Sequence, residues 1–354
     1  MSDHFSSSDD DLEEFVNVFK IPKSINYFEQ IVPQFSEQQY REHFRIGRQL
    51  TQQLANQFEV SEYYHYQEGD SEKITALKFI TVFLWYAGSE AGSFRDVADR
   101  FDISKSSLYK IIRRVTYFLS NLSPQVIKWP TNEEQIEIEE HYRGKGFPGV
   151  VGIIDGTHIR IDKPDEDSDS YLNRKHFYSI QAQVVCDHKK RIVDIFVGYP
   201  GSVHDGRVFR NSPLSRILQE KCRDFYLLAD SGYPCLPQML TPFRDTGNLT
   251  RRQRNFNYIL SKNRYVIEHC FGLLKQKLRQ LYHIKLKSIP DIVHFIRSCA
   301  VLHNLAIDDE FIIHYEILPH PDDNPVEIEI ENDEDDGNGS VKRNEVMNSL
   351  DLVI

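Results

Sequence analysis

Three carboxylates stand at positions where a fold could bring them together. Asp155 follows the apolar run Val150-Val-Gly-Ile-Ile, and Asp230 follows Phe225-Tyr-Leu-Leu-Ala. Both runs have the length of a buried strand, and ligands of open α/β sheets bind at the carboxyl ends of such strands. Glu268 lies near the apolar edge of a helical pattern, where an acid is costly unless it is paired or binds a cation. We therefore expect the three side chains to converge.

Converging carboxylates suit a hard divalent cation such as Mg²⁺ or Mn²⁺. Two such ions about 4 Å apart can activate an attacking oxygen and stabilise the leaving oxygen of a phosphodiester. Taken singly, an Asp-Gly after a strand is more often a turn, and a helical Glu is more often a surface acid. Asp205, in Ser202-Val-His-Asp, is either a further metal ligand or the N-cap of the following helix.

The pattern around these residues predicts an α/β sheet. Apolar alternation predicts three antiparallel strands, a helix, a fourth strand and two further helices. The expected ranges are 150–155, 178–186 and 191–199 for the first strands, 205–221 for the helix, 225–230 for the fourth strand, and 255–281 and 289–308 for the last helices. We expect the helix over 255–281 to bury Tyr258, Ile259, Val266, Phe271, Leu274 and Leu278. Tyr265 also has the spacing of a core residue.

Five successive motifs carry a resemblance to a known family. They are Ile153-Ile-Asp-Gly-Thr-His-Ile, Ser202-Val-His-Asp, Leu228-Ala-Asp-Ser-Gly-Tyr-Pro, Asn257-x3-Ser261-x2-Arg264-x3-Glu268-x2-Phe271-Gly-x2-Lys275, and Val301-Leu-His-Asn. In order and spacing, over about 149–305, the chain resembles PIF/Harbinger-type DDE transposases and the nuclease derived from them. The resemblance implies a ribonuclease-H-like fold, a catalytic triad of Asp155, Asp230 and Glu268, and a Myb/SANT-like protein partner.

A helical region precedes this part. Ser93 and Ser104 can cap two short helices joined by the turn Phe101-Asp-Ile, which predicts a helix-turn-helix at about 93–118. Its second helix would turn Lys105, Tyr109, Lys110 and Arg113 to solvent, as a DNA-binding helix does, although an ordinary helical hairpin has the same pattern.

Charge is distributed unevenly along the chain. The net charge of −11 comes from the ends, since residues 1–20 carry net −5 and residues 321–354 carry net −9, which leaves net +3 for 21–320. Residues 251–297 hold eleven Lys and Arg against two acids, a stripe that suits a phosphate backbone or a solvated helix face. Further candidates for DNA contact are Arg174 and Lys175, which also fit a solvated turn, and Arg264 and Lys275.

These patterns predict an α/β ribonuclease-H-like DDE catalytic domain preceded by an all-α helix-turn-helix region. The expected layout is an acidic disordered tail at 1–30, a helical region at 31–125, a linker at 126–148, the nuclease domain at 149–308 and an acidic disordered tail at 309–354. No C-x-x-C pair occurs among five cysteines, which favours reduced thiols, and no run is apolar enough for a membrane helix. No organic cofactor is expected.

Three functions fit these residues. The leading one is a metal-dependent DNA endonuclease or transposase-derived nuclease, with DNA as partner and the nucleus, or also the cytoplasm, as its location. The second is a DNA-binding adaptor that keeps the fold without requiring catalysis. The third is a metallophosphatase, which the basic stretch and the helix-turn-helix disfavour. Self-association is open.

Overall fold

The structure is a computed structural model of the 354-residue chain. It describes residue 24, residues 26–64, 74–90, 93–307, residue 309 and residues 337–353. Most of the expected N-terminal tail and residues 310–336 of the expected C-terminal tail therefore lie outside the described residues.

Short helices fill the N-terminal region. Several begin at a Ser or Thr whose side chain accepts a hydrogen bond from the backbone of the first turn, as at Ser36, Thr75, Ser93 and Ser104. The elements are η1 (Tyr27–Ile31), η2 (Val32–Gln34), α2 (Glu37–Phe44), α3 (Arg48–Glu59), η3 (Glu62–Tyr64), α4 (Ala76–Gly88), α5 (Phe94–Arg100), α6 (Lys105–Asn121) and α7 (Ser123–Val126). The two capped helices expected within 93–118 are thus present as α5 and α6.

The range 126–148 is not the linker that its Pro, Gly and Glu content suggested. It contains α8 (Asn132–Gly144), which packs on β1 of the sheet. Thr131 and Glu134 form a reciprocal capping box at its start. At its end Glu139 accepts the backbone N–H of Gly149 at 2.8 Å and pairs with Arg143. These contacts tie the helix to the first strand.

Five strands form one mixed sheet in the order β3-β2-β1-β4-β5. They are β1 (Val150–Arg160), β2 (Ser179–Cys186), β3 (Ile192–Pro200), β4 (Tyr226–Leu228) and β5 (Met239–Leu240). The first three are antiparallel, whereas β4 and β5 run parallel to β1. This confirms the predicted meander and the ribonuclease-H-like arrangement.

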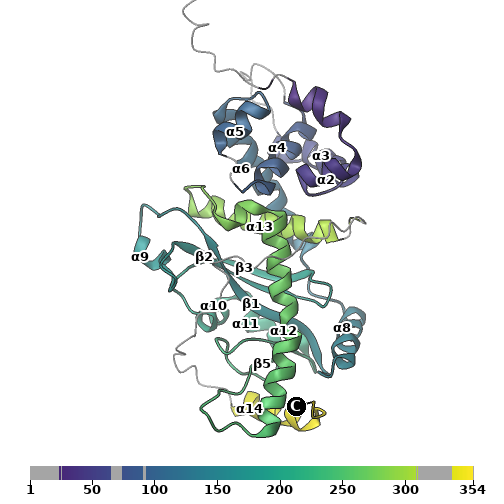
Figure 1. The fold of residues 1–354 in the computed structure, drawn as a ribbon, viewed down its shortest axis with the longest axis vertical. Helices are drawn as coiled ribbons and strands as arrows, with labels where there is room; N and C mark the ends of the chain where they lie inside the picture. Colours follow the sequence, from purple (N-terminus) through teal and green to yellow (C-terminus); the bar gives the residue numbers. More distant parts are fainter. Residues whose placement is uncertain are drawn as a thin grey trace, which may run out of the picture.

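Helices lie on both faces of the sheet. They are α9 (Ser168–Tyr171), α10 (Asp205–Asn211), α11 (Pro213–Cys222), α12 (Arg251–Lys277), η4 (Arg279–Tyr282) and α13 (Ile289–Ile307). The single helix expected over 205–221 is two, because Ser212 is extended and Pro213 starts a new helix. In Figure 1 the long helix α12 crosses the sheet from end to end.

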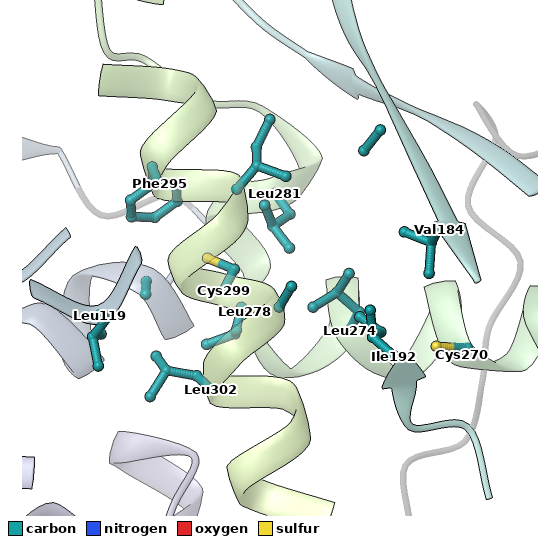
Figure 2. Close-up of a cluster of buried hydrophobic side chains, with 14 of the residues drawn as sticks. Leu119, Val184, Ile192, Cys270, Leu274, Leu278, Leu281, Phe295, Cys299 and Leu302 are labelled. Atoms are coloured by element: carbon teal, nitrogen blue, oxygen red, sulfur yellow. The ribbon is translucent and has the colours of Figure 1, made fainter. Parts of the chain in front are cut away.

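The helical region and the sheet share one continuous core. Figure 2 shows α13 in the middle of this core: Phe295 and Leu302 lie on α13, with Leu119 of α6 on one side of the helix and Ile192 of β3 on the other. A second cluster, with Ile154 and the α11 residue Leu218, fills the opposite face of the sheet. Because alternate strand residues serve the two clusters, the sheet is buried on both sides. Among the described residues no helix is long and apolar enough to cross a membrane.

The expected C-terminal tail contains a docked helix, α14 (Gly337–Ser349). Val346 and Leu350 are buried, and the Arg343 guanidinium lies over the ring of Phe243. The side chain of Asn255 donates to the carbonyl of Asp351 and accepts the N–H of Val353, which fixes the end of the chain on α12. The prediction of disorder over 309–354 is therefore wrong for residues 337–353, whose order comes from tertiary contacts.

Candidate active site

Asp155 and Asp230 extend from paired positions in adjacent strands. Ile153 of β1 pairs with Leu228 of β4, and each aspartate comes two residues later in the chain, Asp155 within β1 and Asp230 just after β4. Side chains two residues apart share a face, and Ile153 and Leu228 both belong to the core cluster that α12 covers. We expected Asp155 to end its strand, but β1 continues to Arg160 because β2 pairs with it that far. Only the pairing with β4 stops before Asp155.

Arg264 of α12 lies over this position. Its guanidinium donates to Oδ2 of Asp155 at 2.8 Å, and both side chains are only 16% exposed. The other carboxylate oxygen of Asp155 accepts the backbone N–H of Gly156 at 2.8 Å. A buried carboxylate is thus held in one orientation by two donors, one of them cationic.

Asp205 approaches from the first turn of α10. The N-cap of that helix is His204, so the N-cap role considered for Asp205 is wrong. The Nε2 atom of Gln181 on β2 donates instead to Oδ1 of Asp205. A Cβ atom at Gly156 would collide with this carboxylate, so glycine is required there for Asp205 to reach β1.

Asp230 sits in a tight turn after β4. Its Oδ1 accepts the N–H of Gly232 at 2.8 Å. The next residue, Tyr233, is 3% exposed, and its buried hydroxyl has no hydrogen-bond partner in the part of the chain that the structure describes. The pKa of Tyr233 lies well above its ordinary value because of burial and because Asp205, Asp155 and Asp230 are close by. The hydroxyl is therefore buried beside three carboxylates.

Glu268 follows Arg264 by one turn of α12 and is solvent-exposed. Residues four apart on a helix are neighbours, so Glu268 lies on the side of α12 that carries the Arg264–Asp155 contact. Its negative charge raises the pKa of Asp155 and that of Arg264. Asp230 and Glu268 thus each interact electrostatically with Asp155.

The site carries excess negative charge. Burial raises the pKa of Asp155 to about 7, with Asp230 and Glu268 adding to the rise and Arg264 opposing it. Burial also holds the pKa of Asp205 well above its usual value, and Asp230 and Asp155 act in the same direction. The Arg264 guanidinium interacts with four carboxylates, and a bound cation would improve this balance of charge.

The donor set fits a hard divalent ion by charge and by atom type, since all four side chains offer carboxylate oxygens. Within the described ranges, however, no three His, Cys, Asp or Glu side chains lie close enough together to hold one ion. Arg264 occupies one oxygen of Asp155, and its positive charge compensates that carboxylate. An ion held by three of these side chains at once would therefore need them to lie closer together.

The predicted DNA-contact residues of α6 have partners on α13. The hydroxyl of Tyr109 lies 3.4 Å from Asp291, and Arg113 pairs with the same carboxylate at 3.6 Å. Tyr109 is still 47% exposed, and Lys105 and Lys110 face solvent. This surface remains accessible, although part of it is tied to the next helix.

The other predicted DNA-contact residues differ in solvent exposure, which decides whether they can contact a phosphate. Arg174 donates to the His204 ring beside Asp205, which places it next to the site. Lys275 is only 5% exposed, so the direct phosphate contact expected of it is not available in this structure. Burial lowers the pKa of His158 to about 4, and the charges of Lys275 and Lys175 add to this, so both lysines lie near His158.

Two side chains of the site escaped prediction. Gln181 belongs to an alternating strand that predicts burial and nothing more. Tyr233 stands inside the motif Leu228-Ala-Asp-Ser-Gly-Tyr-Pro, so its place next to Asp230 was a usable signal.

Comparisons with known proteins agree with the fold. Residues 154–304 match the family model described as DDE superfamily endonuclease. The chain is 29% identical over 269 residues to "Putative nuclease HARBI1" of Homo sapiens, covering 74% of each chain. It is 31% identical over 248 residues to the protein of that name from Mus musculus, covering 68% of this chain and 70% of that one. "Protein ALP1-like" of Arabidopsis thaliana is 25% identical over 233 residues, or 60% of this chain and 56% of that one. No solved structure matches the chain.

The sheet order, the strand-borne aspartates and the family match define a DDE superfamily endonuclease domain. More narrowly, the chain belongs to the Harbinger transposase-derived nucleases, the family of the HARBI1 proteins.

Proposed function

We propose that this protein is a divalent-metal-dependent DNA endonuclease whose catalytic residues are Asp155, Asp230 and Glu268. The proposal rests on the parallel register of β1 and β4, in which Ile153 pairs with Leu228 and Asp155 and Asp230 each follow two residues later. Arg264 of α12 pairs with Asp155, and Glu268 follows Arg264 by one turn of the same helix. Structural acids seldom gather in this way, because burying several like charges together is costly. Buried carboxylates with raised pKa values instead suit a catalytic site.

Asp155, Asp230 and Glu268 would hold Mg²⁺ or Mn²⁺, and Asp205 is a fourth candidate ligand. When bound, such ions activate an attacking oxygen and stabilise the leaving oxygen of a phosphodiester. Other residues of the chain orient the carboxylate oxygens of the proposed ligands. Gly156 N–H and Arg264 fix the two oxygens of Asp155, and Gln181 fixes one oxygen of Asp205 so that the other can face the site. Among the described residues, the hydroxyl of Tyr233 has no competing hydrogen-bond partner.

DNA is the proposed substrate. Supporting it are the net basic composition of residues 21–320 and the exposed Lys105 and Lys110 on α6. Arg174 beside the site is placed to contact a phosphate near the cleaved bond.

We propose that the protein acts in the nucleus, with the cytoplasm as a second location, and that it has a Myb/SANT-like partner protein. Assembly into homo-oligomers is part of the same proposal.

The direct test is cleavage of end-labelled duplex DNA by the full chain with Mg²⁺, with Mn²⁺ or with chelator. The proposal predicts shortened products with either metal and intact DNA with chelator. Tight DNA binding without cleavage under every condition, also with added nuclear extract as a source of partner, would favour the adaptor function. Hydrolysis of small phosphomonoesters without DNA cleavage would favour the phosphatase.

A further inference from the structure

The outer face of α12 is a continuous solvent-facing stripe. Its residues recur every three or four positions, which places them on one side of the helix. They are Arg251, Arg254, Tyr258, Ser261, Lys262 and Tyr265, all of which are exposed. The opposite side of the helix, with Phe256, Ile259 and Ile267, faces the core. The spacing placed Tyr258 and Tyr265 with the core, and both instead belong to the outer face.

Two large aromatic side chains stand out on this face. Tyr258 is 49% exposed and Tyr265 is 55% exposed. The ring of Tyr265 makes an edge contact with the imidazole of His269, with centroids 4.0 Å apart. Seven residues of helix separate the two tyrosines by about 10 Å along the axis. Both rings therefore offer aromatic surface to a ligand outside the helix.

The charge on this part of α12 has one sign. Residues 251–267 contain Arg251, Arg252, Arg254, Lys262 and Arg264 and no Asp or Glu. The first acid is Glu268, one of the proposed metal ligands. A cationic face of this kind is complementary to a polyanion. A partner protein helix would instead need apolar anchors spaced along the face, and only the two tyrosines are available.

The outer face leads directly to the proposed catalytic site. At 100° per residue, Tyr265 lies about a quarter turn around the helix from Arg264, which holds Asp155. Glu268 follows Tyr265 by less than one turn. A nucleic acid strand with a phosphate at the carboxylates can therefore continue along Tyr265, Lys262 and Tyr258.

We propose that the outer face of α12 binds an unpaired DNA strand next to the cleavage site. Arg254 and Lys262 contact its phosphates, while Tyr258 and Tyr265 stack on its bases. An unpaired strand is favoured over duplex because the base faces of a duplex are covered by neighbouring base pairs, and a tyrosine can stack only on a base that is unstacked. The inference rests on the proposed function, since it names the form of DNA that the site accepts.

The test measures binding of the full chain in chelator, so that no cleavage occurs. Two DNAs of the same sequence are compared, one fully paired and one with a short unpaired gap that carries 2-aminopurine. The variants are Tyr265→Leu and Tyr258→Leu, which lose the aromatic face, and Tyr265→Phe, which keeps it. Both tyrosines are exposed, so thermal unfolding should be unchanged in each variant, and this is checked first.

We expect Tyr265→Leu to weaken binding to the gapped DNA by roughly tenfold and to leave duplex binding unchanged, because stacking contributes only where a base is free. Tyr265→Phe should bind like the unsubstituted chain. Binding should quench 2-aminopurine fluorescence, and Tyr265→Leu should lose that quenching. The proposal would be overturned if Tyr265→Leu weakened binding to both DNAs equally or to neither. It would also be overturned if the unsubstituted chain did not prefer gapped DNA. Cleavage plays no part in this readout, so failure of the endonuclease proposal would appear separately, as intact DNA in the metal-containing assay.

Discussion

Arg264 and Asp155 form a 2.8 Å ion pair between α12 and the central strand of the sheet, across 109 positions of the sequence. Removing one partner of a largely buried pair leaves the other charge uncompensated. We predict that Arg264→Gln lowers the free energy of unfolding by about 2 kcal/mol at pH 8 in chelator. Added Mg²⁺ or Mn²⁺ should restore part of it, because a cation then balances Asp155.

Chemical denaturation with and without metal measures this effect. Arg254→Gln is the matched control, since it makes the same substitution on the exposed side of the same helix. Equal stability of the two variants, or no response of Arg264→Gln to metal, would mean that the ion pair does not stand in for a bound cation.

Lys110 on α6 tests the helix-turn-helix prediction. If α6 contacts DNA, Lys110→Ala should weaken binding to all sequences alike and reduce the slope of log binding constant against log salt by about one unit. Lys145, which follows α8 at a distant part of the molecule, supplies the control Lys145→Ala (Figure 1). An unchanged slope for Lys110→Ala would restrict α5 and α6 to a structural role.

Asp194 on β3 predicts a pH dependence away from the catalytic site. Burial raises its pKa to about 6, and Lys221 opposes the rise only in part. A carboxyl group whose pKa is raised by folding binds a proton more tightly in the folded chain, so its contribution to stability falls as pH rises from about 4 to about 6. Asp194→Asn removes that titration.

We therefore expect Asp194→Asn to be more stable than the unsubstituted chain by about 2 kcal/mol above pH 7 and to differ little from it near pH 4. Denaturant titrations across this range give the comparison. A stability difference that does not change with pH would show that the carboxyl group titrates normally.

The sequence was sufficient to predict the two buried strands that precede Asp155 and Asp230, because both apolar runs have strand length. It could not locate the partners of these residues. Arg264 was expected to contact DNA, whereas it pairs with Asp155. Contacts of this type depend on how α12 packs across the sheet. The periodicity of apolar residues along the chain does not predict that packing.

Two helices were missed for different reasons. Thr131 and Glu134 form a capping box that a search for helix starts could have found, but the charged composition of α8 suggested a linker. For α14 no such signal exists, since its order depends on the contact of Arg343 with Phe243 and of Asn255 with the chain end. Tyr258 was placed on the wrong side of α12 because aromatic residues were assumed to be buried.

The most direct test of the whole account is Asp230→Asn, assayed for DNA cleavage and for equilibrium DNA binding on one preparation whose thermal unfolding matches the unsubstituted chain. The amide keeps the size of the side chain but is a poor ligand for hard cations. Losing several kcal/mol of transition-state stabilisation should lower the cleavage rate at least about a hundredfold, since each 1.4 kcal/mol is tenfold. Binding should be largely unchanged because it depends on contacts of Lys and Arg with phosphates. Full cleavage by Asp230→Asn would contradict the DDE mechanism.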